Sequence, residues 1–254
     1  MPREPEELRA AVEEYLDGLE LTPDLGTLQE SMRHGLGGKR VRPVICLAAG
    51  EAAGGEVETI LPAAAAVELV HSFSLVHDDL PALDDDDERR GRPSVWAAYG
   101  EATAILAGDA LLVEAFRLAL SFRTPSVARE LAVATLGMIG GQHLDLQGGH
   151  DLATLHSLKT GALFTASVMC GILAAELPEQ QHGPWRGFAR ELGPLFQIVD
   201  DLLDGDGYVV EVGPDETRRL ADAAGERALA RLAEIDADTT VLAQVVAGLV
   251  ARTS

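Results

Sequence analysis

Apolar residues recur at three- and four-residue spacing through most of this chain of 254 residues, and this periodicity restricts its fold more than any other feature. Strict alternation, which indicates strands, is confined to a short stretch near 208–212. Only 4% of the residues are aromatic, and alanine and leucine, which favour helices, supply much of the 47% that are apolar. The sequence therefore predicts an all-α fold, a large helical bundle that forms a single domain over 1–254.

The apolar pattern and the helix breakers place the expected elements. Helices are predicted at 5–18, 26–34, 37–53, 59–80, 92–99, 102–122, 125–147, 152–176, 184–205, 214–234 and 239–252. Turns are predicted at Gly54–Gly55, Gly148–Gly149, Pro178 and Gly205–Gly213. No stretch is long enough to be a linker, and no repeat indicates a solenoid.

The formal net charge of −21 excludes partners that demand a basic surface, such as nucleic acid or an anionic membrane. No apolar run reaches the roughly 18 uncharged residues of a membrane span, and residues 1–4 lack a basic-then-apolar secretion signal. We therefore expect a cytoplasmic protein without membrane insertion. Cys46 and Cys170 stand alone in apolar segments and are expected to be buried.

An aspartate cluster at 196–204 has clear helical geometry. At about 100° per residue, one stripe of the predicted helix carries Gln197, Asp200, Asp201 and Asp204. A solvated amphipathic helix is the alternative explanation. However, apolar residues cover nearly all of the remaining surface, so the stripe is expected to face an enclosed space. Carboxylates buried there need cations, and hard divalent metals are the natural partners of converging oxygens.

A second cluster lies earlier in the chain, after a long apolar helix, and contains Asp78, Asp79 and Asp84. Pro81 predicts that the helix ends or distorts there. The acidic run 85–88 is expected either to assist or to form a solvated loop, and its spacing does not match an EF-hand. Magnesium prefers a few carboxylates together with phosphate oxygens, so two such clusters suit a diphosphate substrate.

Positive charge is sparse, and the chain has only two lysines, Lys39 and Lys159. The segment 37–43 (GGKRVRP) begins a predicted helix, where backbone N–H groups attract anions. A surface cationic turn is the alternative, while the spacing excludes a Walker A loop. His71 precedes Asp78 by two helical turns, so both are expected to address the same cavity.

Six motifs carry a resemblance, in this order: GGKRVRP, ELVHSFSLVHDDLPALDDDDERRGRPS, AILAGDALL, GGQHLDL, KTGALF and FQIVDDLLD. Together they resemble the bacterial short-chain trans-isoprenyl diphosphate synthases, the farnesyl diphosphate synthase group. The resemblance extends from about residue 30 to 205 and resumes in the last helix. It implies an isoprenoid synthase-like bundle around a central cavity, prenyltransferase activity, magnesium as cofactor and a homodimer.

The resemblance also implies roles for individual residues. The direct magnesium ligands would be Asp78, Asp84 and Asp200, assisted by Asp79, Asp201 and Asp204. The isopentenyl diphosphate site would comprise Lys39, Arg42, His71 and Arg90. The allylic diphosphate site would comprise Arg89, Lys159, Thr160 and Gln197, with Lys159 joining the aspartates as a catalytic group. The expected reaction is ionisation of the allylic diphosphate, condensation and elimination.

Product length in similar synthases often depends on a bulky residue four or five positions before the first aspartate, and these positions hold Ser74 and Phe73. We expect Phe73 to form the floor of the cavity, which favours farnesyl diphosphate over geranyl and geranylgeranyl diphosphate. Simple packing in the core is the alternative for this ring.

One departure from the family stands out. A loop with two lysines and a further aspartate usually follows the second motif, but here Gly205–Tyr208 lead directly into a helix. Arg252 is a candidate to compensate. A non-catalytic diphosphate-binding subunit is a rival function, and the missing loop is its best support. A terpene cyclase is a second rival. It needs no second diphosphate site, so the candidate site residues Lys39, Arg42 and His71 argue against it.

Overall fold

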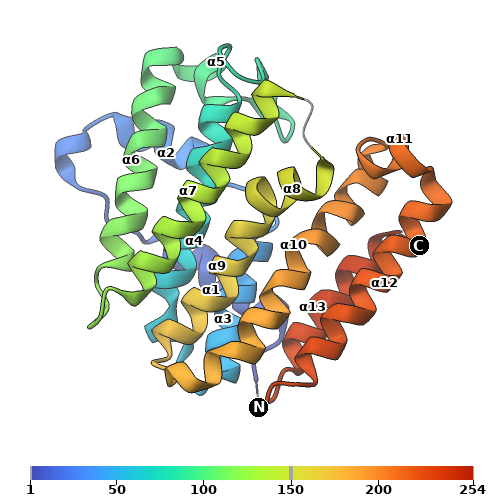
Figure 1. Ribbon diagram of the computed structural model, residues 1–254. Coiled ribbons are helices and arrows are strands. Elements are labelled where there is room, and N and C mark those ends of the chain that lie inside the picture. Colours follow the sequence, from blue (N-terminus) through green and yellow to red (C-terminus); the bar gives the residue numbers. More distant parts are fainter. Residues whose placement is uncertain (1, 149–150, 254) are drawn as a thin grey trace.

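The computed structural model describes residues 2–148 and 151–253, and it is helical almost throughout, which confirms the predicted all-α fold (Figure 1). The α-helices are α1 (Pro5–Asp17), α2 (Leu28–Gly35), α3 (Val41–Ala52), α4 (Val57–Asp78), α5 (Val95–Tyr99), α6 (Glu101–Ala119), α7 (Ser126–Gln147), α8 (Leu152–His156), α9 (Ala162–Ala174), α10 (His182–Asp204), α11 (Tyr208–Val212), α12 (Pro214–Leu232) and α13 (Thr240–Val250). The short elements are the 3₁₀ turns η1 (Pro23–Leu25), η3 (Glu179–Gln181) and η4 (Ala251–Thr253), the π-helical turn η2 (Ser157–Gly161), and the strands β1 (Glu88–Arg89) and β2 (Arg92–Pro93).

Helix α4 lies at the centre of the bundle. It is apolar on all sides rather than along one stripe, and α1, α2, α3, α6, α7 and α9 pack around it. The small residues Ala63–Ala66 are all buried and let these neighbours approach closely. Behind α4, helices α3 and α9 also pack tightly, because a Cβ at Gly171 would collide with the carbonyl oxygen of Cys46. Cys46 and Cys170 are buried, as predicted.

The last third of the chain forms a second group of helices, drawn in orange and red in Figure 1. Helix α10 is strongly amphipathic, and it buries Phe188, Leu192 and Leu195 against its neighbours. Helix α12 packs along α10, and α13 packs against α12, α10 and α3. Together, these contacts hold α10 beside the central helices, with its polar stripe available for a site.

Two segments, α4 and Leu152–Ala174, are long and apolar enough to cross a membrane by composition alone. However, 67% and 56% of their most apolar windows, respectively, are buried inside the protein. Such burial is typical of the core helices of a globular bundle.

Three predicted helices differ from the structure where the site is built. The helix predicted at 37–53 begins only at Val41, because Arg40 has left-handed backbone geometry (φ 54°). The helix predicted at 59–80 ends at Asp78, before Pro81, as the proline requires. The helix predicted at 152–176 is interrupted by the π-helical turn η2.

Two further segments correct the prediction. Residues 92–93, predicted as helix, form β2, which pairs antiparallel with β1 and brings Arg89 opposite Arg92. The segment Gly205–Gly213, predicted as a turn, contains the short helix α11. The turn predicted at Gly148–Gly149 falls partly outside the described residues.

Candidate active site

A cavity of about 900 Å³ lies between α4, α7, η2, α9 and α10. Most residues predicted for the site line it: Arg42, His71, Phe73, Ser74, Asp78, Arg89, Arg90, Lys159, Thr160, Gln197, Asp200 and Asp201. The other predicted residues, which do not line it, are Lys39, Asp79, Asp84 and Asp204. The fold thus gathers residues from both halves of the chain around one space.

The first aspartate of each motif lines the cavity and forms no ion pair with a described residue, Asp78 at the end of α4 and Asp200 on α10. Burial raises the pKa of Asp78 to about 6, although Lys159 opposes the rise. Burial also raises the pKa of Asp200, and Asp204 adds to this effect. Because removal from water disfavours the charged form, both carboxylates are poised to accept a cation.

The second aspartate of each motif is buried and bonded within the protein. Asp79 accepts a hydrogen bond from Nε of Arg89 at 2.6 Å, and the same guanidinium forms an ion pair with it at 2.5 Å. Asp201 accepts from Nε2 of Gln197 at 2.7 Å and from the backbone N–H of Tyr208 at 3.0 Å. Both side chains therefore act first as anchors for neighbouring groups.

The third aspartate of each motif, Asp84 or Asp204, is exposed. The backbone N–H of Asp84 donates to the carbonyl oxygen of Asp78 at 2.9 Å, so the acidic loop folds back over the end of α4. Asp86 donates in the same way to the carbonyl of Asp79 at 3.1 Å. These bonds satisfy carbonyl groups that the end of a helix leaves unpaired, and they keep the loop beside the cavity.

No cluster of three or more His, Cys, Asp or Glu side chains forms a metal site within residues 2–148 and 151–253. The oxygen donors that line the cavity are nevertheless of the type that magnesium prefers. Magnesium usually binds through one or two carboxylates and completes its coordination with substrate phosphates and water. The residues present fit a metal that is held jointly by protein and substrate.

The residues predicted for isopentenyl diphosphate meet in an adjoining cavity of about 250 Å³. Its lining includes Lys39, Arg42, His71 and Arg90, together with Arg252 from the turn after α13. Lys39 and Arg252 have no ion pair among the described residues. This cavity therefore offers several cations to one anionic group.

Arg42 and His71 both line that cavity, and each is half-buried. The guanidinium carbon of Arg42 lies 4.5 Å from the ring centroid of Phe164 and 5.5 Å from that of Phe196, distances typical of cation–π contacts. Burial lowers the pKa of Arg42 to about 10, so it stays charged at neutral pH. Burial and the nearby cation Arg42 lower the pKa of His71 well below its ordinary value, so this imidazole is neutral.

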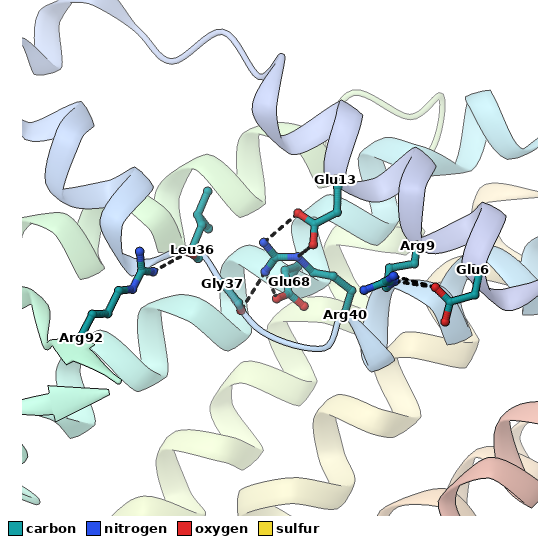
Figure 2. A network of polar contacts seen from close by, with 8 residues as sticks. All are labelled: Glu6, Arg9, Glu13, Leu36, Gly37, Arg40, Glu68 and Arg92. Carbon is teal, nitrogen blue, oxygen red and sulfur yellow. Dashed lines mark hydrogen bonds and ion pairs between the residues drawn. The ribbon is translucent and has the colours of Figure 1, made fainter. Parts of the chain in front are cut away.

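Arg40, which lies between Lys39 and Arg42 in sequence, has a different task (Figure 2). Its side chain is buried and pairs with Glu68 at 2.7 Å and with Glu13 at 3.0 Å. It also donates to the carbonyl oxygen of Gly37 at 2.8 Å, which closes the glycine-rich turn. Arg40 thus holds the backbone of segment 37–43 in place, whereas Lys39 and Arg42 remain available to a ligand.

The residues predicted for the allylic diphosphate lie on η2 and α10. Nζ of Lys159 pairs with Oδ2 of Asp145 at 2.5 Å. The hydroxyl of Thr160 donates to Oε1 of Gln197 at 2.9 Å, which connects the π-helical turn to α10. Arg89 comes from β1 and is held by its ion pair with Asp79.

The π-helical turn is in close contact with two neighbouring helices. A Cβ at Gly141 on α7 would collide with the backbone of Lys159, and a Cβ at Gly193 on α10 would collide with the backbone of Gly161. Glycine at both positions lets the three backbones approach, and this contact directs Lys159 and Thr160 into the cavity.

Phe73 and Ser74, the residues predicted to limit product length, both line the cavity. The ring of Phe73 is 6% exposed and lies edge-on to His77, with 5.8 Å between ring centroids. Ser74 donates to the carbonyl oxygen of His71 at 2.9 Å. The role of Phe73 as the floor stays a prediction.

Some residues that build the site were not predicted: Glu13, Glu68, Gly141, Asp145 and Tyr208. Gly141 and Asp145 lie four residues apart inside the motif GGQHLDL, so their shared helix face was a usable signal. The two glutamates and Tyr208 carried no such local signal, because Arg40 lies 27 and 28 positions from the glutamates and the contact of Tyr208 with Asp201 crosses the connection between α10 and α11.

Residues 26–214 match the family model described as polyprenyl synthetase. The chain is 44% identical to a geranylgeranyl diphosphate synthase of Cyanophora paradoxa, over 70% of this chain and 65% of that protein. It is 40% identical to a farnesyl diphosphate synthase of Bacillus subtilis (strain 168), over 78% of this chain and 72% of that protein. The alignments thus span about two thirds to three quarters of these two relatives.

Solved structures match along nearly the whole chain. A geranyltransferase from Legionella pneumophila has a TM-score of 0.85 and 30% identity, covering 98% of this chain and 96% of that one. An FPP/GFPP synthase from Zymomonas mobilis has a TM-score of 0.85 and 31% identity, covering 97% and 99%. The helical arrangement that surrounds the cavity is therefore shared with these proteins.

Proposed function

The chain belongs to the polyprenyl synthetase family, and on that premise we propose that it is a short-chain prenyltransferase that condenses isopentenyl diphosphate with an allylic diphosphate. The observation that supports this most is the 900 Å³ cavity, in which carboxylates from two helices lie near cations. Relatives whose names state farnesyl or geranylgeranyl diphosphate synthesis add support.

We propose that each diphosphate has its own set of cations. Isopentenyl diphosphate would bind in the 250 Å³ cavity with Lys39, Arg42 and Arg90, while His71 positions Arg42. The allylic diphosphate would bind near Arg89, Lys159, Thr160 and Gln197. Lys159 would leave Asp145 in order to contact the substrate.

Magnesium is the proposed metal, and Asp78 and Asp200 would hold it, with Asp84 and Asp204 nearby. When bound, it would neutralise the diphosphate and make it a better leaving group. The buried anchors Asp79 and Asp201 would hold Arg89 and Gln197 in place around it.

In the proposed reaction, the C–O bond of the allylic diphosphate breaks, and its electron pair leaves with the diphosphate. The double bond of isopentenyl diphosphate attacks the resulting cation to form a C–C bond, and a proton passes to the departed diphosphate. Leu163, Met138 and Phe196 line the cavity and would exclude the water that otherwise traps the cation.

A direct test is incubation with isopentenyl and dimethylallyl diphosphates and magnesium, followed by chromatography of the products. A prenyltransferase forms longer linear diphosphates. A cyclase forms cyclic hydrocarbons from a linear diphosphate, and a non-catalytic subunit forms no product although it binds diphosphate. Absence of turnover with retained diphosphate binding would contradict the proposal.

One specific observation favours the alternative hypothesis of a non-catalytic diphosphate-binding subunit. Where the family usually carries lysines, Asp206 and Gly207 line the cavity, so this edge contributes no cation. Mixing the chain with a catalytically competent synthase and measuring turnover would separate the two functions, because a non-catalytic subunit changes its partner's product without forming its own.

We propose farnesyl diphosphate as the main product, with geranyl and geranylgeranyl diphosphates as the next alternatives. Phe73→Ala should shift products toward longer chains, because removal of a cavity-lining ring makes room for another isoprene unit. The substitution costs about 3–5 kcal/mol for a fully buried ring, so folding is checked by circular dichroism. Unchanged product length in a folded, active variant would show that Phe73 is not the floor.

We further propose a homodimer formed through α6 and α7, and a cytoplasmic location. On α6 and the residue that caps it, Leu106, Val113 and Leu120 recur at seven-residue spacing and are 56%, 68% and 60% exposed. Val133 and Leu136 on α7 are each 70% exposed. A second copy would cover these residues, and Val113→Asp should convert a sedimenting dimer to a monomer. A monomeric unmodified protein would contradict this assembly.

A further inference from the structure

The connection between α10 and α11 is short and folds tightly against the site. Helix α10 ends at Asp204, and α11 begins at Tyr208. Gly207 has φ 45°, and a Cβ there would collide with the carboxylate of Asp201. Because Gly207 has no side chain, the backbone N–H of Tyr208 reaches Oδ2 of Asp201 at 3.0 Å.

From Asp201 a chain of hydrogen bonds runs along the cavity wall. Gln197 donates its Nε2 to Oδ1 of Asp201 at 2.7 Å, and its Oε1 accepts from the hydroxyl of Thr160 at 2.9 Å. A carboxylate only accepts hydrogen bonds, so it determines which end of the Gln197 amide faces it. The amide oxygen must then face Thr160.

The ring of Tyr208 adds a second link to the same wall. It lies edge-on to His156, with 5.6 Å between ring centroids, and His156 immediately precedes the π-helical turn. His156 also lines the cavity. The start of α11 therefore contacts the cavity wall that carries Gln197 and Thr160, through a backbone N–H and through an aromatic ring.

We infer that the Gly207–Tyr208 peptide is a positioning element of the allylic diphosphate site, which acts through Asp201 on Gln197 and Thr160. This inference rests on the proposed function of that site. The connection contributes no cation, but it orients the two polar groups that face the substrate. Its shortness is what brings the Tyr208 N–H within hydrogen-bonding distance of Asp201.

Two substitutions at Tyr208 isolate the backbone contact. Tyr208→Ala removes the ring and keeps the N–H, whereas Tyr208→Pro removes both. Tyr208 is the first residue of α11, where proline is tolerated, and the glycine before it accommodates the altered backbone. Relative to Tyr208→Ala, Tyr208→Pro should raise the KM for dimethylallyl diphosphate about tenfold, as for one lost hydrogen bond to a charged group.

If Tyr208→Pro only disturbed the fold, the KM values for both substrates would change. The KM for isopentenyl diphosphate should be the same in the two Tyr208 variants, while Tyr208→Pro should unfold at a somewhat lower temperature because Asp201 loses one hydrogen bond. A matched glycine pair provides an independent comparison, since Gly205 and Gly207 both have positive φ (76° and 45°) but only a Cβ at Gly207 would meet the carboxylate of Asp201. Gly207→Ala should raise the allylic KM more than Gly205→Ala does.

Calorimetric binding of inorganic diphosphate with magnesium gives a readout that does not require turnover. Tyr208→Pro should bind diphosphate more weakly than Tyr208→Ala. If the unmodified protein forms no product, the proposed function fails while this binding comparison still decides the inference. Equal diphosphate affinity and equal allylic KM in the two Tyr208 variants would overturn the inference. If Tyr208→Pro does not fold, equal allylic KM in Gly205→Ala and Gly207→Ala would overturn it.

Discussion

The two aspartate motifs distribute their carboxylates in the same way but anchor different partners. In each motif, the first aspartate lines the cavity, the second is buried and bonded within the protein, and the third is exposed; in chain order these are Asp78, Asp79 and Asp84, and Asp200, Asp201 and Asp204. The buried aspartates are each 2% exposed. Asp79 holds the cation Arg89, whereas Asp201 holds the neutral Gln197 and a backbone N–H.

This difference shows that the positive charge of the site is supplied unevenly. The first motif brings its own guanidinium to the cavity edge. The second motif brings polar groups without charge, so the cation predicted for the allylic group on that side comes from η2, as Lys159. The comparison implies that Asp78 and Asp200 have the same role, whereas the buried anchors Asp79 and Asp201 have different roles.

The largest expected effect concerns Asp78 and Asp200, the first aspartates of the two motifs. Asp78→Ala and Asp200→Ala should each lower kcat on the order of a hundred- to a thousandfold, since each removes a group that stabilises the departing charge. Asp206→Ala is the control, because Asp206 lines the same cavity outside both motifs. Steady-state kinetics measures kcat for the three variants. Near-normal turnover in Asp78→Ala or Asp200→Ala would show that the two motifs do not contribute equally.

A smaller effect should separate the two lysines. Lys39→Ala should raise the KM for isopentenyl diphosphate, and Lys159→Ala the KM for the allylic substrate, each by roughly tenfold or somewhat more, as for a lost charged hydrogen bond. Varying one substrate while the other is saturating measures both constants. An increase in the same KM for both variants would contradict the division of the cations.

The smallest kinetic effect should come from packing at η2, and adjacent glycines on α7 provide a matched pair. Alanine at Gly140 meets open space, whereas alanine at Gly141 would collide with the backbone of Lys159. Both substitutions favour helix by up to about 1 kcal/mol. Gly141→Ala should nevertheless lower kcat/KM for the allylic substrate by about tenfold through displacement of Lys159, and Gly140→Ala should not. Equal kinetics would show that this close contact does not position the lysine.

Much of the cavity could be predicted from local helical geometry. His71 and Asp78 lie two turns apart on α4, and both line the cavity, as expected from their spacing. The second aspartates could not be assigned in this way. Helical position places Asp79 and Asp201 next to the cavity residues, but their burial depends on Arg89 and Tyr208, which belong to a hairpin and to the start of the short helix α11.

Other features depend on contacts that no local pattern records. The left-handed Arg40 is held by Glu68, 28 positions away, so the predicted start of α3 was too early. The π-helical turn forms where Gly141 and Gly193 let two helices press against it, and a continuous apolar pattern gives no sign of that interruption. Tertiary packing overrides local propensity at both places.

The division between cavity and anchor aspartates predicts opposite effects on stability in metal-free protein. The pKa of Asp78 is raised from its ordinary value of 3.8 to about 6, so its ionisation destabilises the folded state, with the full penalty above about pH 6. The penalty shrinks as pH falls between these two values, and it is gone only below the ordinary pKa of 3.8. Asp78→Ala should therefore be at least as stable as the unmodified protein at pH 7, and this advantage should shrink below about pH 6 and be lost only below the ordinary pKa of 3.8. Asp79→Ala and Asp201→Ala should each lose about 1–3 kcal/mol, because each leaves polar partners without a bond.

The most direct measurement is thermal unfolding of the four single alanine variants at Asp78, Asp79, Asp200 and Asp201, with and without magnesium and inorganic diphosphate. Ligand at about a hundred times its Kd should stabilise the unmodified protein by about 2.7 kcal/mol. Asp78→Ala and Asp200→Ala should keep their intrinsic stability and lose this gain, whereas Asp79→Ala and Asp201→Ala should unfold at lower temperature without ligand. Full ligand stabilisation in Asp200→Ala, or unchanged intrinsic stability in Asp201→Ala, would contradict the account.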